Sequence, residues 1–178
     1  MSPAVWYFAR SAGIVAYLLL SGSVIVGLLM AGRASLSWPR FAVEELHRFL
    51  AILAGVFIVL HGSSLLLDRV VPISLGQMLV PFTSPYRPLA VGLGVTAAEL
   101  MAAVGVTNLL RGHLPRHVWR RAHYLTLGVW GLASLHGVLA GSDRGEPWFA
   151  GLAAAAAMAV ALAFAVRMRS SLAAAAAP

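Results

Sequence analysis

HRFLAILAGVFIVLHG, residues 47–62, and HYLTLGVWGLASLHG, residues 123–137, are the two stretches that decide the fold of this 178-residue chain. Each begins with a histidine, continues through 13 or 12 mostly apolar residues, and ends in His-Gly. They belong to uncharged runs at 49–67 and 122–142, which as α-helices would be about 28–32 Å long and would match a hydrocarbon core about 30 Å thick. Both stretches are therefore predicted to be membrane-spanning helices.

Three further runs of similar length indicate a bundle of such helices. The runs at 11–32 and 147–166 carry no charged residue, and the run at 88–110 is interrupted only by Glu99. Apolar residues make up 60% of the chain and charged residues 11%, which excludes an ordinary soluble domain. We predict an all-α integral membrane bundle of about five transmembrane helices over residues 1–169, followed by an Ala-rich disordered tail at 170–178. The short loops of this chain leave no room for a nucleotide-binding or other soluble catalytic domain.

The arginines predict the orientation of the bundle in a cell membrane. All 13 basic residues are arginines, and they lie in loops between apolar runs instead of forming one basic face, so nucleic acid is excluded as a partner. Loops that would share one side of the membrane hold nine arginines, and the opposite loops hold four. The positive-inside rule then places the amino terminus outside and the carboxyl terminus in the cytoplasm. The nine are Arg33, Arg40, Arg48, Arg111, Arg116, Arg120, Arg121, Arg167 and Arg169; the four are Arg10, Arg69, Arg87 and Arg144.

Four histidines fall at two matched depths of this bundle. His47 and His123 begin their helices at the cytoplasmic side, and His61 and His136 lie about 21 and 20 Å further along. Because both helices run in the same direction, His47 pairs with His123 and His61 with His136. One imidazole from each of two facing helices is the arrangement that holds a haem iron by both axial positions. All four are therefore predicted to be metal ligands and cofactor-binding residues, and the absence of cysteine excludes covalent c-type attachment.

The spacing of the histidines differs between the two helices. The 14 residues from His47 to His61 fall about 40° short of four full turns, whereas the 13 residues from His123 to His136 fall about 140° short. The later helix must therefore be distorted, or must present two of its sides to differently placed haems. Glycines after the outer histidines and between the two depths could let a flat macrocycle approach the backbone, with ordinary helix packing as an equal alternative. They are Gly55, Gly62, Gly128, Gly131 and Gly137.

The same residues resemble a known family. WRRAHYLTLGVWGLASLHGVLAGSD at 119–143 and VPFTSPYRPLAVGLG at 80–94 are similar to bacterial members of the ferric reductase-like transmembrane domain. This haem-binding core is shared by ferric reductases, NADPH oxidases and the membrane subunit of the bacterial methionine sulfoxide reductase system. The resemblance covers about residues 6–145 and implies two stacked b-type haems between the second and fourth helices. It also makes the 13-residue spacing acceptable, since the family is similar there.

The resemblance also bears on donor and acceptor. Full-length oxidases and reductases of the family continue into FAD and NADPH domains, which this chain lacks, so electrons must come from a separate flavoprotein or a flavin. We interpret the chain as an electron-transfer subunit that carries electrons from this cytoplasmic donor to an extracytoplasmic acceptor, with ferric iron as the leading candidate. An alternative is a haem anchor that supplies a separate extracytoplasmic reductase. A non-redox alternative is a small transporter or assembly subunit that uses intramembrane histidines.

Residues near the predicted haems are candidates for supporting roles, and no catalytic residue is assigned. Arg48, Arg120 and Arg121 lie beside the inner histidines, where guanidinium groups could pair with haem propionates, so they are predicted to bind the cofactor. The same arginines also fit a role in fixing topology. Trp130 and Phe57 lie between the two depths and could shorten the electron path, although aromatic packing is the better default.

Other polar residues are expected to have bland roles. His113 and His117 are four residues apart, but Pro115 between them argues against a regular helix, so we expect solvated loop residues and no metal site. Glu99 lies in a predicted span, so we expect it to face the bundle in a protonated or paired state. Four residues on the outer side could bind an acceptor or simply mark the membrane interface. They are Tyr86, Arg87, Asp143 and Arg144.

Overall fold

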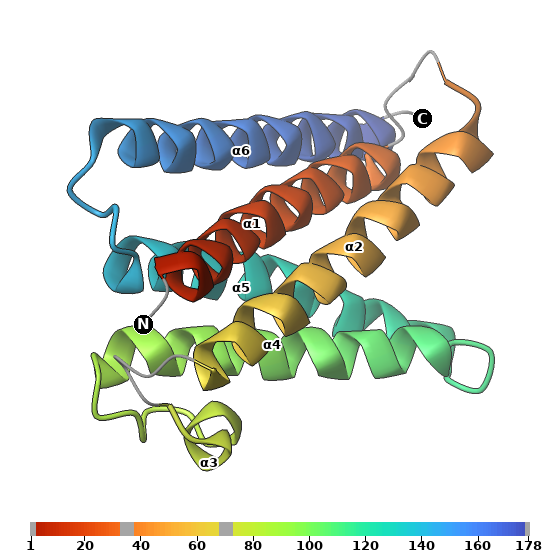
Figure 1. The fold of residues 1–178 in the computed structure, drawn as a ribbon. Coiled ribbons are helices and arrows are strands. Elements are labelled where there is room, and N and C mark those ends of the chain that lie inside the picture. Colours follow the sequence, from red (N-terminus) through yellow and green to blue (C-terminus); the bar gives the residue numbers. More distant parts are fainter. Residues whose placement is uncertain (1–2, 33–37, 68–72, 177–178) are drawn as a thin grey trace.

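The computed structural model describes residues 3–32, 38–67 and 73–176, and within these ranges the chain is helical and has no strand. Figure 1 shows that α2 and α5 begin at the same end of the bundle and run in the same direction, as predicted, with α2 oblique to the others. The helices are α1 (Pro3–Ala31), α2 (Arg40–Leu66), α3 (Leu75–Leu79), α4 (Pro88–Leu109), α5 (Arg116–Ala140) and α6 (Pro147–Ala176).

Prolines mark the starts of the helices that follow loops. Pro88 and Pro147 are the first residues of α4 and α6, and Pro39 and Pro115 directly precede α2 and α5. Proline lacks an amide hydrogen and holds φ near −65°, so it fits the first turn of a helix, where no intrahelical partner exists for that amide. The prolines therefore set where the long helices begin.

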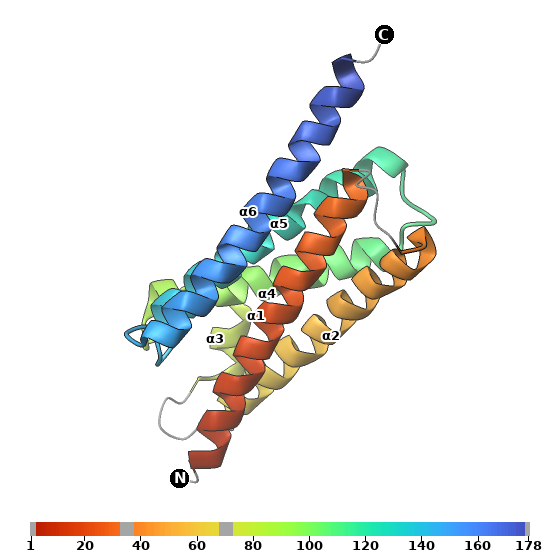
Figure 2. The same ribbon diagram turned by 90° about the horizontal axis from the view of Figure 1, so that it is seen from above.

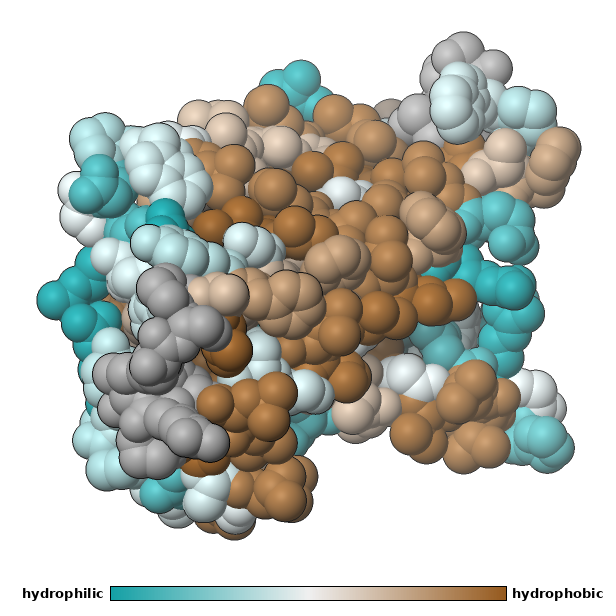
Figure 3. Space-filling model, in the orientation of Figure 1, coloured by the Kyte–Doolittle hydropathy of each residue, from teal (hydrophilic) through white to brown (hydrophobic). Residues whose placement is uncertain are grey.

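Membrane character is confirmed for most of the long helices. Helices α1, α2, α4 and α6 are long and apolar enough to cross a membrane. Figure 3 shows an apolar surface across the middle of the molecule and hydrophilic residues at both ends. Helix α5 has 25 residues, about 37 Å, but carries three arginines in its first two turns, and its crossing stays a prediction.

Helix α1 occupies the centre of the bundle. It lies between α6 and α2 in both views and also contacts α5, whereas α5 packs mainly on α4 (Figures 1 and 2). Small and branched residues from five helices meet in one buried cluster, which holds the histidine-bearing helices in place. The cluster consists of Leu20, Val24, Leu28, Ala54, Ala97, Val129, Val160 and Ala163.

The carboxyl end differs from the prediction. Helix α6 continues to Ala176, so residues 170–176 are helical instead of a disordered tail. The physical reason is the alanine content, because alanine has the highest intrinsic helix propensity and extends a helix that has already formed. Residues 177–178, Arg33 and Arg69, the last two of which entered the arginine count, lie outside the described residues.

Candidate metal centres

The four predicted histidines form two pairs in space. The ring centroids of His47 and His123 are 5.9 Å apart, and those of His61 and His136 are 6.2 Å apart. In both pairs the imidazole planes are steeply inclined, at 72° and 73°. The structure therefore brings together the same residues that were paired by depth.

Three of the histidines are tied to a backbone carbonyl through Nδ1. His61 Nδ1 donates to the carbonyl oxygen of Ala9 at 2.8 Å and His47 Nδ1 to that of Ser23 at 2.9 Å, both on α1. His136 Nδ1 donates to the carbonyl oxygen of Ala90 on α4 at 2.8 Å. A carbonyl can only accept, so each Nδ1 carries the proton and the neutral ring keeps its lone pair on Nε2.

This arrangement fits a metal ion held between each pair. Ligating histidines usually donate their other ring N–H to a carbonyl or carboxylate, which fixes the tautomer and the ring orientation. Metal–imidazole bonds of about 2.0–2.1 Å separate the two ligating nitrogens by about 4 Å and the ring centroids by roughly 6 Å. Both observed centroid separations have this size.

A glycine lies four residues after each of the three carbonyls. A Cβ added at Gly13 would lie 3.0 Å from His61 Nδ1, one at Gly27 would lie 3.1 Å from His47 Cε1, and one at Gly94 would lie 2.5 Å from His136 Nδ1. In an α-helix the carbonyl of residue i accepts from the amide of residue i+4. The missing side chain at i+4 therefore lets an imidazole reach the same carbonyl from outside the helix.

These three glycines were not predicted from the sequence. The signal that could have found them is the separation of 14 residues between Gly13 and Gly27, which equals that between His47 and His61. Of the glycines that were considered, Gly62 and Gly137 face Met78 and Phe149. A Cβ added at any of the other three would have nothing within 4 Å; these are Gly55, Gly128 and Gly131.

The fourth histidine departs from the pattern. His123 Nδ1 is buried and has no hydrogen-bond partner in the described part of the chain. Instead, the ring stacks on the indole of Trp119, with centroids 5.4 Å apart and planes inclined by 22°. Helix α5 is continuous from Arg116 to Ala140, so of the two expectations for its 13-residue spacing, the helix presents two different sides and is not distorted.

The arginines predicted to bind a cofactor lie at the level of the inner pair. Arg48 is within 3.5 Å of the Glu45 carboxylate, and Arg120 is within 3.4 Å of the Tyr124 hydroxyl. These side chains and that of Arg121 are exposed. Their contacts are on the protein surface, where each contributes little to stability, and pairing with propionates stays a prediction.

Two of the four outer candidates have structural partners. The buried Asp143 carboxylate forms an ion pair with Arg10 at the start of α1. Arg87 donates to the carbonyl oxygen of Leu139 near the end of α5 at 2.9 Å. Both contacts fasten loops to helices at the outer end. Tyr86 is half-buried and Arg144 is exposed.

The expectation for Glu99 was wrong, because its side chain is exposed and does not face the bundle. Helix α4 turns Ala90, Ala97 and Val104 inward, which are seven residues apart and lie on one face. Glu99 follows Ala97 by two residues and therefore lies about 200° around the helix.

His113 and His117 are both exposed, as expected, although His117 lies in the first turn of α5. No cluster of three or more His, Cys, Asp or Glu side chains that could hold a metal ion occurs among the described residues. Each histidine pair thus offers two protein ligands. Comparison of the chain with protein-family models, curated proteins and solved structures found no match.

Proposed function

We propose that this chain is a membrane-embedded di-haem b-type cytochrome, which passes electrons from a cytoplasmic donor, a separate flavoprotein or a flavin, to an extracytoplasmic acceptor. The observation that carries the proposal is the geometry of the two imidazole pairs, whose ring centroids lie 5.9 and 6.2 Å apart on parallel helices. The resemblance of residues 119–143 to the ferric reductase-like transmembrane domain supports the same reading.

The number of ligands favours haem over a bare metal ion. Two imidazoles from the protein complete the coordination of an iron whose other four ligands come from a porphyrin, whereas a bare ion needs further protein ligands. When bound, the haem supplies one-electron redox chemistry. The chain would supply Nε2 of His47, His61, His123 and His136, hold three of these rings through Nδ1, and surround them with apolar side chains.

The hydrogen bonds of the histidines argue against the non-redox alternative. A histidine that relays protons must exchange them at both ring nitrogens. At His47, His61 and His136 the Nδ1 proton is committed to a carbonyl that is itself part of a helix. Such rings suit a fixed metal ligand better than a proton relay or a transport step.

The proposal is tested by counting haem in the purified protein. We expect two b-type haems per chain after pyridine extraction, and a low-spin reduced-minus-oxidised spectrum, because each iron would have two imidazole ligands. A stoichiometry of zero in protein that is folded and monodisperse would overturn the cytochrome proposal.

Single histidine substitutions test the pairing. His61→Ala and His136→Ala should each remove the outer spectral component, and His47→Ala and His123→Ala the inner one, because each pair shares one iron. His113→Ala and His117→Ala are matched controls, since these exposed histidines belong to neither pair. If the two substitutions within one helix removed the same component, the cross-helix pairing would be wrong.

The acceptor follows from the resemblance alone. Ferric iron and a separate extracytoplasmic reductase are the two candidates, and reduction of an impermeant ferric chelate by the reduced protein distinguishes them. Rapid reduction favours a ferric reductase. A reduced protein that is inert toward the chelate favours an anchor for a separate reductase.

A further inference from the structure

The register of the helices explains why His123 lacks the carbonyl anchor of the other three histidines. Moving 14 residues back along α2, from His61 to His47, moves the acceptor 14 residues forward along α1, from Ala9 to Ser23. The same walk from His136 to His123 is 13 residues, and 13 residues forward from the acceptor Ala90 lies Ala103.

Position 103 cannot serve His123 in the same way. The residue four positions after Ala103 is Thr107, whereas the other three carbonyls are followed at that position by glycine. The 13-residue step also turns His123 about 140° away from the direction of His136. Both differences remove the helix-carbonyl anchor at this one histidine, which matches the buried Nδ1 that has no partner among the described residues.

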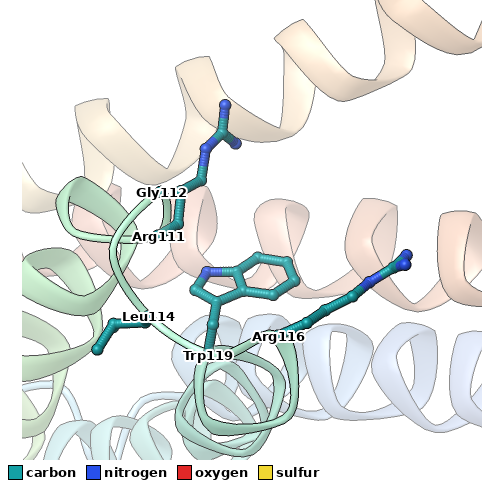
Figure 4. A pocket seen from close by; sticks show the side chains of 5 residues that line it. All are labelled: Arg111, Gly112, Leu114, Arg116 and Trp119. Carbon is teal, nitrogen blue, oxygen red and sulfur yellow. The ribbon is translucent and has the colours of Figure 1, made fainter.

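Trp119 takes the place beside His123 that a helix backbone takes beside the others. Its indole stacks on the imidazole, one turn earlier on the same helix. The indole is held in turn, because Nε1 donates to the side-chain oxygen of Asn108 at the end of α4 at 2.8 Å. Figure 4 shows the indole between the Arg111 and Arg116 side chains, where it forms part of a surface pocket.

We infer that Trp119, fixed by Asn108, is the positioning residue for His123. This inference rests on the proposed haem function, and it makes the inner site depend on a contact between the ends of α4 and α5 that the outer site does not have. The outer site has two ligands anchored to helix carbonyls. The inner site has one such ligand, His47, and one that is oriented by stacking.

The test uses the full chain loaded with haem and three variants at this contact. Trp119→Leu removes the stack, Trp119→Phe keeps an aromatic ring but loses the indole N–H, and Asn108→Ala leaves the indole without its acceptor. Loss of a contact that orients a metal ligand typically lowers affinity about 10–100-fold. We expect a loss of this size for the inner haem of Trp119→Leu, smaller losses for the other two, and an unchanged outer haem.

A second readout separates positioning from general destabilisation. The electron paramagnetic resonance signal of a low-spin ferric haem depends on the angle between its two imidazole planes, which is 72° for the inner pair and 73° for the outer pair. In Trp119→Leu the inner signal should shift and the outer signal should stay unchanged. Trp119→Phe should restore most of the inner signal.

The control is Trp38→Leu, at an exposed tryptophan that directly precedes the last residue before α2 and lies at the same end of the chain's helices. An inner signal and inner affinity that equal those of the unmodified protein in Trp119→Leu would overturn the inference, and so would equal losses at both sites. Either result leaves the cytochrome proposal intact, whereas absence of haem from the unmodified protein would overturn that proposal first.

Discussion

The Nδ1 atom of His61 donates a hydrogen bond of 2.8 Å to the carbonyl oxygen of Ala9, which lies 52 residues earlier in the chain. Ala9 is inside α1, so its carbonyl already has the amide of Gly13 as its regular helical partner. Because Gly13 has no side chain, the ring of His61 can reach this carbonyl as well. A helix–helix contact and the orientation of a candidate ligand therefore depend on one small residue.

Gly94→Ala should disrupt the outer site more than any of the other glycine substitutions at the histidines. The added Cβ would lie 2.5 Å from Nδ1 of His136, closer than non-bonded atoms approach, and the ring is held by Ala90. Overpacking of this kind costs about 1–3 kcal/mol, so we expect outer-haem affinity to fall about tenfold or more. Haem titration followed by the reduced-minus-oxidised spectrum measures it.

Gly105→Ala is the matched control on the same helix, because a Cβ at that position meets nothing within 4 Å. A helical glycine replaced by alanine without a clash gains up to about 1 kcal/mol of stability. Equal haem binding by Gly94→Ala and Gly105→Ala would show that the ring can move aside and that the glycine is dispensable.

Asp143→Asn should loosen the outer end of the bundle. The Asp143 side chain is buried, and its partner Arg10 directly follows Ala9, the acceptor for His61. Leaving the guanidinium without its carboxylate costs about 1–3 kcal/mol. We expect a lower Tm, and a partial loss of the outer haem with the inner haem retained.

Glu44→Gln is the control for this ion pair. Glu44 pairs with Arg40 at 3.3 Å, but both side chains are exposed, and such pairs contribute about 0–1 kcal/mol. If Asp143→Asn and Glu44→Gln had the same small effect on Tm, the Arg10 contact would be a surface contact without a role in holding α1.

The sequence predicted the helices and the histidine pairs because both follow from spacing along single helices. Apolar runs of membrane length and prolines before helices are local signals. The pairing of His47 with His123 needed only the assumption of parallel helices, and the structure brings these rings together. The redox function and the haems themselves stay predictions.

The anchors of the histidines could not be predicted, because they depend on the register between helices. Nothing in the sequence around Ala9 or Ala90 marks them as acceptors until α2 lies on α1 and α5 on α4. Glu99 was misplaced for a related reason. A charge within an apolar run indicates depth, but the direction in which it points depends on which residues of α4 meet the neighbouring helix.

Trp130→Phe distinguishes packing from a role in electron transfer. The indole Nε1 of Trp130 donates to the Ser21 hydroxyl at 2.9 Å, and the ring packs against the buried cluster. Loss of this hydrogen bond should cost about 0.5–1.5 kcal/mol. We expect a lower Tm with unchanged spectra and an unchanged rate of electron transfer, measured by stopped flow. A slower rate at unchanged haem content would instead assign the indole to the electron path.

Single cysteines can establish the orientation, because the chain has no cysteine of its own. We expect Ser171→Cys to be protected from an impermeant maleimide in intact cells, and Arg144→Cys to be labelled, since nine arginines place the carboxyl terminus inside. Permeabilised cells provide the control, in which both should react. The reverse pattern of labelling would invert the topology and with it the names inner and outer.

The final prediction is that electrons cross the membrane outward and enter at the cytoplasmic histidine pair. The arginine count places His47 and His123 near the cytoplasm and His61 and His136 near the outside, about 20 Å further along the helices. Outward transfer moves negative charge against part of its natural direction only if the inside is positive; with the usual inside-negative potential it is favourable by up to about 2.3 kcal/mol per charge per 100 mV. Vesicles of known orientation, loaded with a reductant and given an impermeant ferric chelate or another impermeant oxidant outside, should therefore reduce the external oxidant faster when an inside-negative potential is imposed. The double variant His47→Ala and His123→Ala should abolish the reaction, whereas the control double variant His113→Ala and His117→Ala should retain it. Reduction that persists without the inner pair would show that electrons enter elsewhere.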